Sequence, residues 1–84
     1  MLFLVTQIHT PETCPIDAGG REALHEKPEN VPGLKMVAGY GAYTEHTLYY
    51  IVEADDYDTV ERFLTPGFKR STATITPVCE FFGE

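Results

Sequence analysis

The feature that most constrains the fold is the distribution of four runs of β-branched, aromatic and aliphatic residues along the chain. Residues of these types favour β-strands. We expect strands over residues 2–9, 34–43, 46–53 and 71–82. The second and third runs are joined at residues 44–45, and so short a connection is typical of a hairpin. The longer gaps, after the first run and after the third, leave room for helices.

The first gap carries helix signals over residues 11–27. Pro11 and Pro15 suit the first position of a helix, and Pro28 stops one. We therefore expect a helix in this gap. The pair of glycines at 19–20 costs about 1 kcal/mol per glycine in a helix interior, so it either allows close packing on the sheet or marks a break.

The second gap predicts an amphipathic helix. Two acids, Asp55 and Asp56, precede it and suit a helix start. Apolar residues then follow at spacings of three and four, which places them on one helix face. They are Tyr57, Val60, Phe63 and Leu64. The Pro66-Gly67 step ends this segment.

Two of the predicted strands contain residues that disturb a sheet. Pro77 has no backbone N–H to donate, so we expect the last strand at a sheet edge or with a bulge there. Gly39 and Gly41 flank Tyr40, and this spacing indicates a bulge or a close approach to the backbone.

The resulting order, βαββαβ, predicts a single α+β domain over residues 1–84 with a ferredoxin-like fold. Its four-stranded antiparallel sheet would carry two helices on one face. The other face would be bare, although the strands over 2–9 and 46–53 carry apolar side chains on both faces. Because an exposed apolar face of that size marks a partner surface, we expect a homodimer that meets sheet to sheet.

Charge and cysteine content restrict the partners and the compartment. Six basic residues stand against 13 acidic ones, for a net charge of -7, which disfavours nucleic acid and membrane surfaces as partners. The apolar opening segment has no preceding basic residues and no cleavage site, so we expect a cytoplasmic protein. In that reducing compartment Cys14 and Cys79 are expected to be free thiols, with a bridge between them as the alternative.

The chain resembles the dimeric α/β-barrel branch of ferredoxin-like proteins. The resemblance rests on element order, on length and on the run from Tyr49 to Asp56 before the second predicted helix. That branch includes small monooxygenases of the antibiotic-biosynthesis type, muconolactone isomerase-like proteins and short uncharacterised bacterial members. It implies a fold and a dimer, and no catalytic motif carries over.

His9 and Cys14 form the strongest candidate site, because they fall in one short loop after the first predicted strand. Both are ligands for transition metals, and a cysteine at a helix N-terminus has a stabilised thiolate. A third ligand would come from Gln7, Glu12, Cys79 or a partner chain. Heavy-metal-associated domains of the same element order bind copper in this loop through two cysteines three positions apart, a pattern absent here. In the alternative interpretation, His9 and Cys14 are structural.

A second candidate site combines tyrosines with proton-transfer groups. Tyr40 and Tyr50 could help to line an aromatic pocket for a planar ligand or cofactor, as the resemblance to cofactor-free oxygenases implies. His25 or Glu53 could act as a general base there. Structural roles for these residues are the alternative.

Two functions follow from these sites, and a third needs neither. The first is a homodimeric protein that binds a transition metal or redox-active ligand through His9 and Cys14. The second is a cofactor-independent monooxygenase or isomerase that acts on a small aromatic substrate. A structural or regulatory dimer without chemistry is the third.

Overall fold

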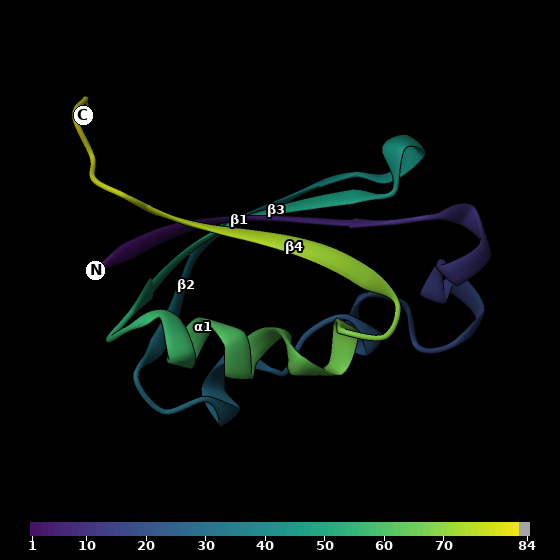
Figure 1. Ribbon diagram of the computed structural model, residues 1–84, viewed down its shortest axis with the longest axis horizontal. Helices are drawn as coiled ribbons and strands as arrows, with labels where there is room; N and C mark the ends of the chain where they lie inside the picture. The colour runs from purple at the N-terminus through teal and green to yellow at the C-terminus, as the bar shows by residue number, and fades with distance from the viewer. Residues whose placement is uncertain (83–84) are drawn as a thin grey trace.

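The computed structural model describes residues 1–82 and shows an α+β fold built on a four-stranded antiparallel sheet (Figure 1). The strand order is β2-β3-β1-β4. The strands are β1 (Leu2–His9), β2 (Leu34–Ala42), β3 (Thr47–Ala54) and β4 (Ser71–Val78). This confirms the expected fold class and sheet, and it is compatible with a ferredoxin-like fold.

The alternation in the central strands places the core on one face of the sheet. Phe3, Val5 and Gln7 of β1 are buried. In the antiparallel register Val5 lies opposite Tyr50 of β3, which is also buried. Successive side chains of a strand point to opposite faces. Leu4, between Phe3 and Val5 in β1, therefore lies on the other face of the sheet and is exposed.

The helix predicted after β3 is confirmed as α1 (Tyr57–Leu64). The Asp56 carboxylate accepts a hydrogen bond from the Thr59 N–H at 2.9 Å and so caps the helix. The hydrogen bonds from Thr59 lower the pKa of this carboxyl. The buried face of α1 consists of Val60, Phe63 and Leu64, as the spacing predicts.

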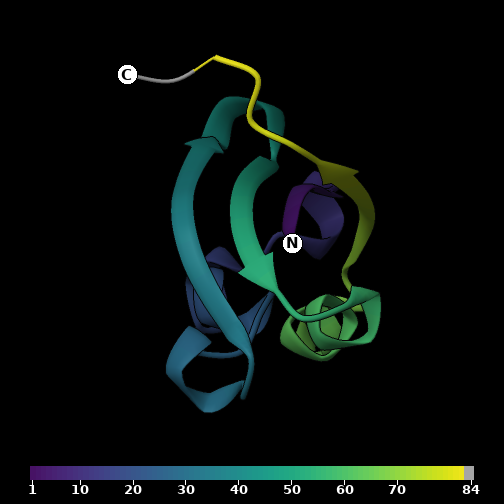
Figure 2. The same cartoon turned by 90° about the vertical axis from the view of Figure 1, so that its left-hand side faces the viewer.

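The prediction of a helix over residues 11–27 is wrong. The chain instead forms short 3-10 turns at Pro11–Thr13, Pro15–Asp17, Gly20–Ala23 and Pro28–Asn30. Gly19 and Gly20 have φ values of 104° and 64°, in the left-handed region that an α-helix cannot contain, so the glycine pair marks a break. Leu24 and Val31 are nevertheless buried in the same core as Phe63. The segment therefore covers the same face of the sheet as α1 (Figures 1 and 2).

The predictions made from Pro77 in β4 and from the glycines in β2 are confirmed only in part. β4 lies at an edge of the sheet, which confirms the prediction from Pro77, but it ends at Val78, so the strand predicted to residue 82 is too long. The bulge in β2 falls between Met36 and Ala38, before the glycines. At Gly41 the predicted close approach is confirmed, since a Cβ would lie 2.6 Å from ring atoms of Tyr43.

The second face of the sheet has no covering element among residues 1–82. Leu4, Ile8 and Tyr49 on this face are 36%, 49% and 37% exposed. Ile51 also lies on it and is half-buried. We call these four residues the open apolar face. Separately, none of the helices within the described residues has the length and apolar character needed to cross a membrane.

Candidate metal centre

His9 and His46 meet where β1 ends beside the β2–β3 hairpin. His9 is the last residue of β1, and its backbone N–H donates to the His46 carbonyl at 3.0 Å. His46 follows a 3-10 turn at Tyr43–Glu45 and has φ 53° and ψ 40°. A left-handed conformation is uncommon for a residue other than glycine, and histidine is among those that adopt it more often. The hairpin thus turns at His46.

Cys14 lies between the first two 3-10 turns and is half-buried. The turn before it is held by Thr10 and Thr13, since the Thr10 N–H donates to Thr13 Oγ1 at 3.0 Å. The turn after it, Pro15–Asp17, is only three residues long. The expectation that Cys14 caps an α-helix is therefore wrong, and a helix dipole does not act on the thiol. Cys14 and Cys79 are both free thiols, as expected.

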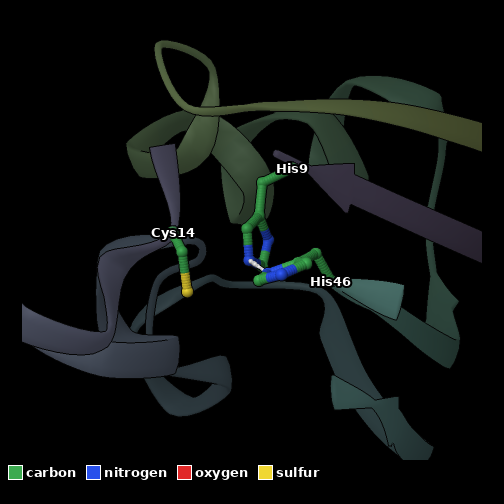
Figure 3. Close-up of side chains that lie close together, drawn as sticks. All are labelled: His9, Cys14 and His46. Carbon is green, nitrogen blue, oxygen red and sulfur yellow. Dashed lines mark hydrogen bonds between the residues drawn. The ribbon is translucent and has the colours of Figure 1, made fainter. Parts of the chain in front are cut away.

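Three side chains converge at this end of the sheet (Figure 3). One donor atom from each of His9, Cys14 and His46 lies within 4.8 Å of the others. The His9 Nε2 and His46 Nδ1 atoms are 3.2 Å apart and share a hydrogen bond. The two rings meet edge to face, with centroids 5.0 Å apart and an interplanar angle of 77°. We call these three residues the His-Cys-His cluster.

The protonation state of His9 suits metal binding. Burial, and secondarily the neighbouring His46, lower the pKa of its imidazole below the usual 6.5. At neutral pH His9 is therefore uncharged, as a metal-ligating histidine must be. Its Nδ1 atom is buried and has no hydrogen-bond partner within the described part of the chain.

The third donor is a residue that sequence reasoning left out of this site. Gln7 faces the core and Cys79 follows β4, whose last residue Val78 pairs with Leu2 at the far end of β1. Neither joins the cluster, and nor does Glu12. His46 is half-buried. The antiparallel pairing of β1 with β3 was the available signal, because it places the β2–β3 hairpin next to the end of β1.

A cavity of about 320 Å³ adjoins the His-Cys-His cluster, and all three cluster residues line it. We call it the metal-centre cavity. The rest of its lining is mainly apolar and includes Pro15, Ile16, Leu24 and Leu48. Arg21 is the one residue of its lining with a permanent charge.

A neighbouring cavity of about 280 Å³ contains most of the second candidate site, and we call it the tyrosine cavity. It is lined by His25, Tyr40 and Tyr50, together with Tyr43. Glu53 is exposed and does not line it. The structure therefore brings His25 together with the two tyrosines but leaves Glu53 outside.

Two polar groups of the tyrosine cavity, the Tyr50 hydroxyl and His25 Nδ1, hydrogen-bond to the protein itself. The Tyr50 hydroxyl donates to Gln7 Oε1 at 2.6 Å. His25 Nδ1 donates to the Glu26 carbonyl at 2.7 Å, and the ring stacks on Phe63 at 4.9 Å between centroids. Burial lowers the pKa of His25, although the hydrogen bond to Glu26 opposes this effect. His25 Nε2 is buried with no partner in the described residues.

Fold and cluster together define the class: a small α+β protein with an antiparallel sheet and a His-Cys-His donor set at one end of it. The chain belongs to the family described as Domain of unknown function (DUF3303), whose family model matches residues 1–81. No match to the chain was found among curated proteins or among solved structures. The family description names no activity.

Proposed function

We propose that the protein binds a transition metal ion through His9, Cys14 and His46. The convergence of the three donor atoms within 4.8 Å is the observation that supports this function. Two imidazoles and a thiolate suit Zn²⁺ or a copper ion, and they do not suit the oxygen-preferring Mg²⁺ or Ca²⁺. The proposed site uses none of the exposed acidic residues as ligands.

The separation of the donors is close to what such an ion requires. With metal–nitrogen bonds of about 2.0–2.1 Å, two nitrogens of a tetrahedral zinc site lie about 3.4 Å apart. His9 Nε2 and His46 Nδ1 are 3.2 Å apart. The donor atoms of the whole set lie up to 4.8 Å apart. A movement of about 1 Å would bring the third donor to the distance that such a site requires. Cys14, in a loop of short 3-10 turns, is placed to make it.

Binding would replace an interaction that the two histidines make with each other. Without metal, His9 and His46 share one proton across their 3.2 Å contact. With metal, the ring that carries this proton would hold it on its other nitrogen, so that His9 Nε2 and His46 Nδ1 each offer a lone pair. Metal uptake therefore releases the thiol proton of Cys14. A reducing cytoplasm, which we propose as the compartment, would keep Cys14 available as a ligand.

Metal affinity of single variants tests this function. Competition with a chromophoric chelator measures the affinity for Zn²⁺, and Co²⁺ substitution reports sulfur ligation through a thiolate-to-cobalt charge-transfer band. We expect Cys14→Ala to abolish the band and to weaken Zn²⁺ binding by at least about 100-fold, since even outer-shell partners are worth 10–100-fold. Cys79→Ala, which removes the other thiol, is the matched control and should behave as the unmodified protein. Equal Zn²⁺ affinity of the two variants would overturn the proposal.

We propose further that the protein forms a homodimer through its open apolar face, in the manner of a dimeric α/β barrel. The support is the exposure of Leu4, Ile8 and Tyr49 on one side of the sheet, because contiguous apolar surface marks a contact with a partner. The test is the mass in solution by light scattering. Leu4→Lys should give a monomer. Lys27→Gln, at an exposed residue outside the sheet, should leave the dimer intact; a monomeric unmodified protein would contradict this assembly.

A further inference from the structure

The three residues of the His-Cys-His cluster line the metal-centre cavity. A metal bound by them would therefore be accessible to a ligand in that cavity. Tetrahedral ions take four ligands, and sites with three protein ligands keep the fourth position for water or substrate. Within residues 1–82, no fourth histidine, cysteine or acidic residue joins the cluster. A metal held there has an open position, and the cavity is lined by all three of its ligands.

The chemistry of the cavity restricts the occupant of that position. The walls offered by Pro15, Leu24 and Leu48 are apolar and suit a hydrocarbon body. Arg21 is exposed, lines both this cavity and the tyrosine cavity, and carries a permanent positive charge. The chain as a whole carries a net charge of -7. A cationic residue at this place favours an anion where the rest of the surface disfavours one.

We infer that the metal centre takes a small organic anion with an apolar body. Its anionic end coordinates the open position of the metal and displaces water. Its apolar body occupies the 320 Å³ cavity beside Leu24 and Leu48, and Arg21 donates hydrogen bonds to its charged end. This inference rests on the proposed metal-binding function and adds the class of ligand to it.

The Co²⁺-loaded protein provides the test, with benzoate, acetate and benzamide as probes. Benzoate has the charge and the apolar ring, acetate keeps only the charge and benzamide keeps only the ring. We expect benzoate to change the cobalt ligand-field bands and to bind at least about tenfold more tightly than acetate, because it buries more apolar surface. Benzamide should leave the bands unchanged.

A pair of variants examines the role of Arg21. Arg21→Gln should weaken benzoate binding by about tenfold, the typical effect of losing a charged hydrogen bond, while the Co²⁺ affinity stays the same. Lys35→Gln removes one positive charge from an exposed site outside the cavity and should leave benzoate binding unchanged.

The outcomes separate this inference from the proposed function. Absence of the charge-transfer band on adding Co²⁺ overturns the metal-binding function itself. A normal band with no spectral response to benzoate overturns only the ligand inference. Equal binding of benzoate and benzamide also overturns it, since the cavity would then bind apolar rings without coordination to the metal.

Discussion

The metal-centre cavity and the tyrosine cavity lie side by side and share Arg21, Tyr43 and Leu48 in their linings, yet their polar groups are used differently. Each has histidine in its wall. In the metal-centre cavity, the side chains of His9 and His46 hydrogen-bond to each other. In the tyrosine cavity, His25 and Tyr50 are tied to the surrounding chain. Residue type alone does not distinguish a binding group from a structural one; its partners do.

Gln7 holds the Tyr50 hydroxyl of the tyrosine cavity in a buried network of hydrogen bonds. It is fully buried, and its amide nitrogen donates to the Leu24 carbonyl and to Ser71 Oγ, each at 3.0 Å. Its carbonyl oxygen accepts from the Tyr50 hydroxyl. Buried polar groups of this kind stabilise a fold when all of them are paired. Gln7 thus ties β1 to β3, to β4 and to the segment of short turns.

The largest expected effect comes from breaking this arrangement. Gln7→Ala leaves the Leu24 carbonyl and the Tyr50 hydroxyl buried without partners, and it opens a cavity. We expect the free energy of unfolding to fall by about 4 kcal/mol, measured by urea denaturation. Thr6→Ala, one residue earlier on the other face of the sheet, is the control and should change it by less than about 0.5 kcal/mol. A similar loss in both variants would contradict the role given to Gln7.

A second prediction compares one histidine from each cavity, since we expect one substitution to reduce metal affinity and the other to reduce stability. His46→Gly should weaken Zn²⁺ binding by at least about 100-fold, or about 2.8 kcal/mol, with little change in stability because glycine adopts a positive φ readily. His25→Ala should do the reverse. It removes a ring stacked on Phe63, which costs about 2 kcal/mol of stability, while the metal affinity stays unchanged. Loss of metal affinity in His25→Ala would contradict the separation of the two cavities.

The smallest effect is a pH dependence of stability that involves His25. Burial lowers the pKa of His25 in the folded state, so the unfolded chain takes up a proton first as the pH falls. The stability from neutral His25 is complete above about pH 6.5, the unfolded value, and is lost as the pH falls toward the lower folded value. In urea denaturation between pH 7.5 and 5, with a chelator present, His25→Phe should lose less stability than the unmodified protein. Parallel curves would show that His25 does not titrate in this way.

Much of the fold followed from local patterns. The alternation in β1 and β3 and the apolar spacing in α1 are properties of neighbouring residues, so they could be read along the chain. The segment over residues 11–27 could not. Its prolines fit helix starts and 3-10 turns equally well, and the choice depended on Gly19 and Gly20 adopting positive φ.

The candidate site was predictable to the same limited extent. His9 and Cys14 are five positions apart, and loop geometry alone indicated that they meet. His46 lies 37 positions from His9, and a contact of that separation requires the strand pairing to be known. The same holds for Tyr50, whose hydroxyl is directed to Gln7 across the pair of strands and not toward a ligand.

The sequence by itself determined the strands, the amphipathic helix, the edge position of Pro77 and a short loop holding an imidazole and a thiol. These are consequences of side-chain periodicity and of backbone chemistry at proline, which act over a few residues. Only the tertiary structure decided which distant groups meet. The antiparallel pairing of β1 with β3 brought His46 to His9 and Gln7 to Tyr50. It thereby separated a set of donors available to a metal from a set committed to the core.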